Sequence, residues 1–341
     1  MSAALLLGAC SLITTYEGLE GATPCIPAKA PARPTAASDG PPLGPLVTAV
    51  SSLVLVGPPN GPAPAAGLDL DDQCTCPGPA SCSTNAESTT CDKDGGIDNG
   101  LRDIFARLRD NGFPLADDLL QGGLTSGLFG ILFRISGYSG KPEDPQVIVE
   151  MLNAVAANEG TGGRPTFEGT DRWTIDATSF VNKQTVAVTL DAYVTRGVLV
   201  AHFERLVPKF RISRSPSTTL LLDLALADVT LVGELAAVGA DGATLKNAQL
   251  SGRSPIASWL LQVQRAGQCA SSDAFLTFRK QLCELRDLAV RASMDNANAP
   301  CGAISLAVGF ESVAATTAAE RAPVESASAC DGTLDAGIGC P

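Results

Sequence analysis

The chain has 341 residues, of which 45% are hydrophobic and 18% are charged, so it is long and apolar enough for one large or two ordinary folded domains. Its 36 acidic and 24 basic residues give a net charge of −12, which disfavours nucleic acid and anionic membrane surfaces as partners. Aromatic residues make up only 5% of the chain and apolar runs are short, which argues against base-stacking platforms and a membrane-spanning helix.

The first ten residues, MSAALLLGAC, end in a motif that resembles a lipoprotein signal. The letters LGAC, ending at Cys10, resemble the lipobox of bacterial lipoproteins, in which the chain is cleaved before a cysteine that carries the lipid. The resemblance implies a signal segment over residues 1–9 and a lipid on Cys10. Because Ser11 rather than aspartate follows, it also implies release to the outer membrane of a Gram-negative bacterium.

Residues 10–70 are rich in Pro, Ala and Gly, a composition that buries too little apolar surface to offset the entropy lost on ordering. We interpret them as a tether. The apolar stretch 46–56, LVTAVSSLVLV, is an exception that fits either a strand added to a sheet edge or an unstructured apolar piece. A cysteine-rich neck and folded body are predicted over residues 71–313, followed by a flexible tail over 314–341.

Eleven cysteines against one histidine are more typical of disulfides than of a zinc site. If Cys10 carries a lipid, an even number remains for pairing, which implies an oxidising compartment outside the cytoplasm. The specific pairs that we predict are Cys330 with Cys340 and Cys269 with Cys283. The disulfide candidates are Cys25, Cys74, Cys76, Cys82, Cys91, Cys269, Cys283, Cys301, Cys330 and Cys340.

The stretch 92–99, DKDGGIDN, is the best candidate site in the sequence. Hard cations such as calcium take about six to eight oxygen ligands, and closely spaced carboxylates around glycines supply them. The stretch resembles the acidic loops of thrombospondin type 3 repeats and EF-hands, although Ile97 stands where an EF-hand has glycine and Asp103 stands at its twelfth position. The ligands that the resemblance implies are Asp92, Asp94, Asp98 and Asn99.

The same residues also fit a structural role, because Asp98 or Asn99 suits the N-cap of a helix. A helix is predicted directly after them and ends at Asn111-Gly112. Its apolar stripe consists of Leu101, Ile104, Phe105 and Leu108. Calcium binding and capping remain alternatives for this stretch. One further short helix is predicted at residues 115–120.

Apolar and polar residues alternate along most of residues 129–252, as expected for strands with one buried face. In the clearest run, residues 185–204, the turn Thr195-Arg196-Gly197 predicts a hairpin. The residues predicted to face the core there are Val186, Val188, Leu190, Ala192 and Val194. A shift of phase at Ala227-Asp228 predicts a β-bulge, and Asp241-Gly242 predicts another hairpin turn. Further strands are predicted at residues 129–136, 147–151, 173–177, 217–235 and 243–252.

At Ser254-Pro255 the apolar spacing changes from that of a strand to that of a helix, with proline at the first helical position. Ser271, Ser272 and Asp273 offer caps for a second helix. A strand at residues 304–311 then returns to the sheet. Together these elements predict a mainly β fold, an antiparallel β-sandwich of jelly-roll type with a few flanking α-helices and disulfides.

Motifs for catalysis are scarce. His202 is the only histidine and lies within a predicted strand, so we interpret it as structural, and the chain has no GxSxG elbow, phosphate-binding loop or GxGxxG motif. Paired carboxylates need no such motif. The acidic residues on predicted strands are Asp176, Asp191, Glu204, Asp223 and Asp228.

These observations predict an extracytoplasmic, lipid-anchored surface protein with a structural or ligand-binding role, stabilised by calcium if the acidic loop binds it. No catalytic residue is assigned. The alternative function is a carbohydrate-active hydrolase that uses two of the strand carboxylates on the β-sandwich. A protein and a glycan both remain open as the ligand.

Overall fold

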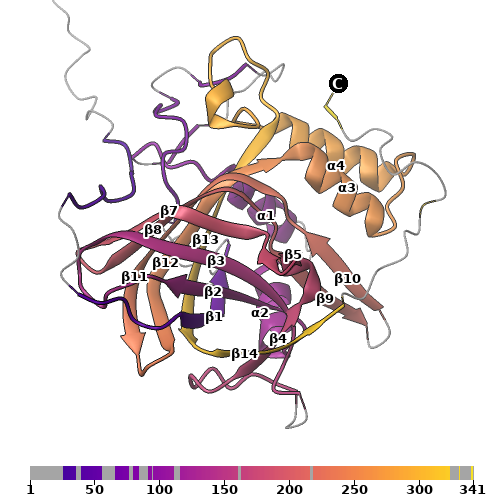
Figure 1. Cartoon of the computed structure of the whole chain (residues 1–341). Coiled ribbons are helices and arrows are strands. Elements are labelled where there is room, and N and C mark those ends of the chain that lie inside the picture. Colours follow the sequence, from indigo (N-terminus) through magenta and orange to yellow (C-terminus); the bar gives the residue numbers. More distant parts are fainter. Residues whose placement is uncertain are drawn as a thin grey trace, which may run out of the picture.

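The chain folds around a closed ring of strands (Figure 1). The computed structural model describes residues 26–35, 40–55, 66–76, 80–83, 91–93, 95–110, 116–159, 163–215, 218–322, 330 and 339–340. The strands of the ring are β1 (Leu46–Val54), β2 (Gly130–Ser136), β3 (Asp144–Ala157), β7 (Ala187–Thr195), β8 (Val198–Leu206), β11 (Leu226–Val238), β12 (Gly242–Pro255) and β13 (Ala303–Ala314).

Six short strands lie outside the ring: β4 (Arg172–Asp176), β5 (Phe180–Val181), β6 (Gln184–Thr185), β9 (Lys209–Ser215), β10 (Thr218–Asp223) and β14 (Thr316–Arg321). The α-helices are α1 (Gly100–Asp110), α2 (Ala116–Thr125), α3 (Ile256–Arg265) and α4 (Asp273–Glu284). Two 3₁₀ turns, η1 (Ala177–Ser179) and η2 (Ala292–Met294), complete the described elements.

The predicted jelly-roll sandwich is wrong, because the strands close into a single barrel. Around the ring the order is β3-β2-β1-β13-β12-β11-β8-β7, and β7 pairs with β3 to complete the circle of eight strands. All of these neighbouring pairs are antiparallel. Side chains alternate between inside and outside along a barrel strand as they do between core and solvent in a sandwich, so the alternation alone fits both.

The inside of the barrel is packed with apolar side chains. Phe133 of β2 and Phe310 of β13 stack there, with their ring centroids 5.7 Å apart. A cavity of about 30 Å³ lies beside them, lined only by apolar residues. Ligand-binding cavities are typically about ten times larger, so this interior is a core and not a ligand chamber.

The apolar stretch 46–56, for which the sequence left two alternatives, forms β1. The strand is not at an edge: Leu46 pairs with Ile135 of β2, and Leu53 pairs with Phe310 of β13. Leu46 is fully buried. The folded body therefore begins well inside the segment 10–70 that was interpreted as a tether. At the other end, β14 and the disulfide-bonded Cys330 and Cys340 lie in the predicted tail.

A second, smaller core covers the outside of β1, β2 and β3. There β4 extends the sheet from β3, and β14 pairs with β4 in parallel. Trp173 of β4 is fully buried in this layer. A Cβ atom on Gly130 would lie 2.5 Å from the indole ring, so only glycine allows this close approach.

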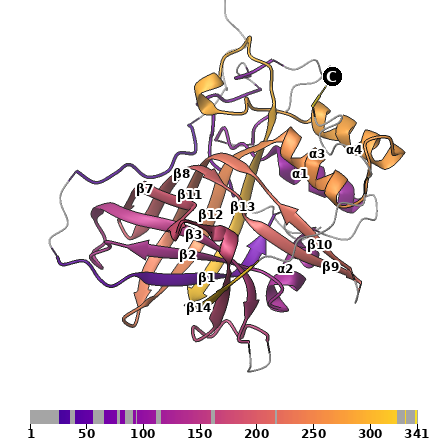
Figure 2. The same cartoon turned by 45° about the vertical axis from the view of Figure 1, so that its right-hand side comes forward.

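Helices α3 and α4 lie side by side at the upper right in Figures 1 and 2, whereas α2 lies apart from them and packs against β1 and β9. The predicted stripe of α1 is confirmed at Leu101 and Ile104, which are buried, and at Phe105, which packs edge-on against Trp259 of α3. The predicted cap of α4 is also confirmed, since Ser272 accepts a hydrogen bond from the N–H of Phe275. Within the part of the chain that the structure describes, none of the helices combines the length and the hydrophobicity that crossing a membrane requires.

For four disulfides, both cysteines lie within the described residues, and these pairs correct the predicted ones. Cys269 pairs with Cys330 and Cys283 with Cys340, so the C-terminal segment is joined twice to the helical side. Cys76–Cys91 and Cys82–Cys301 join the neck, the latter over 219 residues of sequence. All nine cysteines within the described residues are disulfide-bonded, which confirms the prediction of a disulfide-bonded protein. Cys10 and Cys25 lie outside the described residues.

Candidate functional site

A groove of about 790 Å³ lies on the outer face of β7, β8 and β11, and we call it the outer groove. Its floor includes Tyr193 of β7 and His202 of β8. Leu68, Asp69 and Leu70, which precede the cysteine-rich neck, form part of its wall.

Residues 26–35, which we call the strap, lie against this face, and Lys29 and Ala30 line the groove. The guanidinium of Arg33 lies 4.7 Å from the centre of the Tyr193 ring and donates to the Pro145 carbonyl at 2.7 Å. It also forms an ion pair with Asp191. The Tyr193 hydroxyl in turn donates to the carbonyl of Pro31 at 2.5 Å. This face of the barrel thus already holds a basic, proline-rich stretch of the chain.

A break in the alternation of β7 exposes apolar side chains beside the groove. Val188 and Leu190, which were predicted to face the core, are 46% and 64% exposed, whereas Ala192 and Val194 are buried as predicted. The register between β3 and β7 shifts in this region, so Leu190 and Asp191 both point outward. The predicted core face of β7 is therefore wrong in its first half, because a bulge there inverts the phase.

His202 occupies the middle of the groove floor. Its Nδ1 lies 3.1 Å from the hydroxyl of Thr230, its cross-strand partner on β11. Burial lowers the pKa of the imidazole, so the ring is neutral over most of the physiological range. This hydrogen-bonded, uncharged histidine fits the structural role that the sequence suggested.

Three of the carboxylates that the sequence placed on strands line the outer groove: Asp191, Glu204 and Asp228. Each has an arginine near it. Asp191 pairs with Arg33, Glu204 lies 3.5 Å from Arg291, and Asp228 lies 3.9 Å from Arg253. The other two are outside the groove: Asp176 accepts from the N–H of Thr178, and Asp223 lies 3.5 Å from Arg265.

A second group of carboxylates begins in the groove wall, at Asp69, and extends behind it. One carboxylate oxygen from each of Asp69, Asp71 and Asp98 lies within 4.8 Å of the others, and all three residues are buried. We call these three residues the acidic cluster. Backbone N–H groups orient them: Asp72 donates to Asp69 at 2.7 Å, Gln73 donates to Asp71 at 2.9 Å, and Leu70 donates to Asp98 at 2.7 Å.

One oxygen of the acidic cluster lacks a partner. Asp69 is only 6% exposed, and its Oδ2 has no hydrogen-bond partner among the described residues. This oxygen lies beside Gly96 together with the Gln73 carbonyl oxygen and the Cys74 sulfur, since a Cβ atom on Gly96 would lie 3.2, 3.0 and 3.1 Å from them. Gly96 has a φ of +66°, and only glycine fits so close to these atoms. A buried carboxylate oxygen without a partner is costly unless a ligand or proton satisfies it.

The acidic groups raise one another's pKa values. Burial, followed by the negative charges of Asp287 and Asp71, raises the pKa of Asp98 to about 9. Burial likewise raises the pKa of Asp69, and it raises that of the neighbouring Asp92 to about 6. These carboxyl groups therefore favour either a bound proton or a nearby cation over an uncompensated negative charge.

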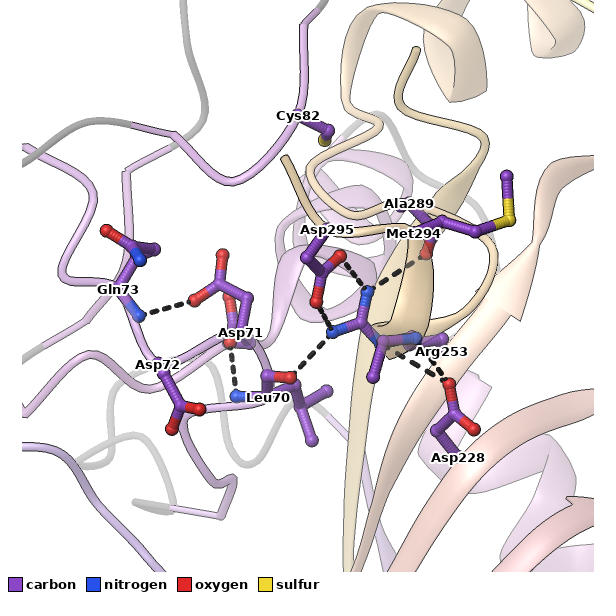
Figure 3. Close-up of polar contacts among 12 residues, drawn as sticks. Leu70, Asp71, Asp72, Gln73, Cys82, Asp228, Arg253, Ala289, Met294 and Asp295 are labelled. Carbon is purple, nitrogen blue, oxygen red and sulfur yellow. Dashed lines mark hydrogen bonds and ion pairs between the residues drawn. The ribbon is translucent and has the colours of Figure 1, made fainter. Parts of the chain in front are cut away.

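Arg253 of β12 holds the backbone at Leu70, the residue between Asp69 and Asp71 of the acidic cluster (Figure 3). Its guanidinium is fully buried and donates two hydrogen bonds to Asp295, at 2.7 and 2.5 Å. It also donates to the carbonyl of Ala289 at 3.1 Å and to the carbonyl of Leu70 at 2.6 Å. The Leu70 N–H donates to Asp98, so Leu70 is held through both its N–H and its carbonyl group.

The predicted loop 92–99 contributes one ligand candidate to the cluster, Asp98. Asp92 lies next to it and accepts from the N–H of Thr75 at 2.6 Å, and Asp94 lies outside the described residues. Asn99 instead bridges to β13, accepting from the N–H of Ala307 at 3.1 Å. At the start of α1, the hydroxyl of Ser305 accepts from the N–H of Gly100 at 2.6 Å.

Sequence reasoning missed Asp69 and Asp71, because both fall within or beside the Pro-rich segment interpreted as a tether. The available signal was GLDLDDQC, an acidic stretch next to Cys74 and Cys76 that resembles the acidic stretch after Cys91 in its composition. The Cys76–Cys91 disulfide brings the two stretches side by side. No protein-family model, no curated protein and no solved structure matches this chain.

Proposed function

We propose that this protein is an extracytoplasmic binding protein, anchored by a lipid on Cys10, whose outer groove binds an extended basic segment of a partner protein. The observation that carries the proposal is the strap, because a basic and proline-rich segment of the chain already lies along the groove. Arg33 makes a cation–π contact, an ion pair and a carbonyl hydrogen bond on the same face. These are the contacts by which a partner's arginine is recognised.

The open part of the groove offers the same chemistry beyond the strap. Glu204, whose side chain is 83% exposed, supplies negative charge, and the exposed Val188 and Leu190 supply an apolar surface beside it. The net charge of −12 adds long-range attraction for a cationic partner. A segment that alternates basic and apolar side chains complements this surface best.

The cellular location rests on the cysteines. Nine disulfide-bonded cysteines favour an oxidising compartment, since such bonds are rare where thiols are kept reduced. The motif that ends at Cys10 supplies the anchor in this proposal.

The arrangement of the groove carboxylates favours binding over the alternative hydrolase. A glycosidase needs two carboxyl groups that face each other across the bound sugar and are free to act on it. Asp191, Glu204 and Asp228 are instead each paired with an arginine that lies within 4.0 Å. The groove thus offers negative charge for recognition.

The proposal is tested with two fluorescein-labelled octapeptides, one alternating Lys, Pro and Leu and one with Glu in place of each Lys. We expect the basic peptide to bind the purified protein in fluorescence anisotropy, and to bind less tightly at higher salt. Glu204→Gln should weaken this binding by about two- to fivefold, the effect of losing one exposed charge pair. Glu320→Gln, at an exposed carboxylate on β14, is the matched control. Equal binding of the acidic peptide, or an unchanged affinity in Glu204→Gln, contradicts the proposal.

A further inference from the structure

We propose that the acidic cluster of Asp69, Asp71 and Asp98 is a calcium site, distinct from the peptide-binding function proposed for the outer groove. Oxygens bound to one Ca²⁺ at about 2.3–2.6 Å lie no more than about 5 Å apart. The three carboxylate oxygens of the cluster, within 4.8 Å of one another, satisfy that limit. An ion among them takes carboxylate oxygens from two segments that are distant in the sequence.

The unpartnered oxygen of Asp69 points to a ligand independently of the clustering. The residue is more than nine-tenths buried, and its Oδ2 has no hydrogen-bond partner among the described residues. A buried carboxylate oxygen of this kind is a donor that calcium takes. A cation there satisfies the Asp69 oxygen that no N–H or O–H in the described residues reaches.

The surrounding contacts hold the donors in place before any ion arrives. Leu70, between two of the ligands, is bonded through its N–H to Asp98 and through its carbonyl to the buried Arg253. The Asp98 N–H donates to the Leu68 carbonyl at 3.1 Å, and the Cys76–Cys91 disulfide joins the two segments. Such a fixed site loses little entropy when it binds a ligand.

The donor set favours calcium over other divalent ions. The cluster is formed by carboxylates alone, without histidine or thiolate, which disfavours zinc. All three ligand residues are buried, so a bound ion must give up much of its hydration shell. Magnesium dehydrates reluctantly and usually keeps several waters, whereas calcium accepts an irregular shell of protein oxygens. The shared negative charge also favours a divalent ion over a monovalent one.

The test is calcium binding to the full chain after treatment with EDTA, measured by equilibrium dialysis with radioactive Ca²⁺ and by isothermal titration calorimetry. We expect one tightly bound ion per chain and weaker binding of Mg²⁺. Asp71→Asn, which keeps the acceptor for the Gln73 N–H, should weaken calcium binding at least tenfold. Asp72→Asn is the matched control, because Asp72 is the adjacent residue, its side chain is 78% exposed, and it pairs with Lys29 outside the acidic cluster. It should bind calcium within about twofold of the parent.

A thermal melt separates loss of the site from loss of the fold. In EDTA, Asp71→Asn should melt at or above the temperature of the parent, since the substitution removes one of several repelling carboxylates. Added calcium should raise the melting temperature of the parent and of Asp72→Asn but not that of Asp71→Asn. Absence of calcium binding by the parent, equal affinity for magnesium, or full affinity in Asp71→Asn would each overturn the assignment.

Discussion

Replacing Arg253 by methionine should destabilise the fold far more than the loss of an ordinary surface arginine. Methionine keeps most of the length of the aliphatic stem but donates no hydrogen bond. The substitution leaves the Asp295 carboxylate without its two guanidinium donors, and it leaves the carbonyls of Leu70 and Ala289 without theirs. The Asp295 side chain is only 15% exposed, so water replaces these donors poorly.

The expected size follows from the burial of the pair. Removing one partner of a buried ion pair typically costs about 3–5 kcal/mol, because the other charge stays buried and uncompensated. The Arg253 side chain is 1% exposed, which places the pair in this class. Burial already raises the pKa of Asp295 in spite of the arginine, so without Arg253 this carboxyl group should take up a proton more readily. The double variant Arg253→Met/Asp295→Asn should recover part of the loss, since it also removes the charge left behind.

The assay is equilibrium unfolding in urea with the disulfides intact, followed by the fluorescence of Trp173 and Trp259, both of which are buried. Lys280→Met is the matched control, because Lys280 forms an exposed pair with Glu284 on α4 and should cost at most about 0.5 kcal/mol. An unchanged slope against urea shows that stability, and not the extent of unfolding, has changed. A loss below about 1 kcal/mol in Arg253→Met would refute the reasoning that this guanidinium holds the Leu70 segment to the barrel.

Two further predictions concern the acidic cluster and the terminus. In calcium-free protein, Asp98 holds a proton in the folded state up to its pKa of about 9 but loses it near pH 4 when unfolded, so stability should fall as the pH rises through this range. Urea unfolding in EDTA at pH 5 and pH 8 measures this loss of stability, and Asp98→Asn should make the loss smaller. A protein that is more stable at pH 8 than at pH 5 would contradict the prediction. For the anchor, expression in a Gram-negative host with labelled fatty acid should label the protein, and Cys10→Ser should abolish the label; label retained in that variant would exclude Cys10 as the attachment site.

The sequence predicted local structure well wherever one short signal decided it. The turn at 195–197 is confirmed, with Arg196 and Gly197 in the left-handed region at φ values of 52° and 78°. The bulge at Ala227-Asp228 is confirmed by the register shift of β11 and by a φ of 47° at Asp228. These features depend on the conformational preferences of a few adjacent residues, which the sequence displays directly.

The arrangement of these elements depended on contacts between distant residues. Closure of the barrel rests on the pairing of β3 with β7, and neither strand carries a local mark that distinguishes this pairing from the edges of a sandwich. The bulge that turned Leu190 outward had no such mark either. The strand-forming stretch 46–54 likewise had no decisive pattern of its own. It became a strand because partners on both sides satisfy its backbone hydrogen bonds.

The same distinction applies to the candidate sites. Carboxylates near 92–98 were visible as a local pattern, and the structure brings Asp98 of that stretch into the acidic cluster. Its partners Asp69 and Asp71 come from a segment more than twenty residues earlier, which the neck disulfide and the hydrogen bonds of Asp98 with Leu68 and Leu70 hold beside it. The sequence by itself determined which carboxylates the chain carries. The tertiary structure decided which of them lie together, because bonds between distant segments set the distances between these side chains.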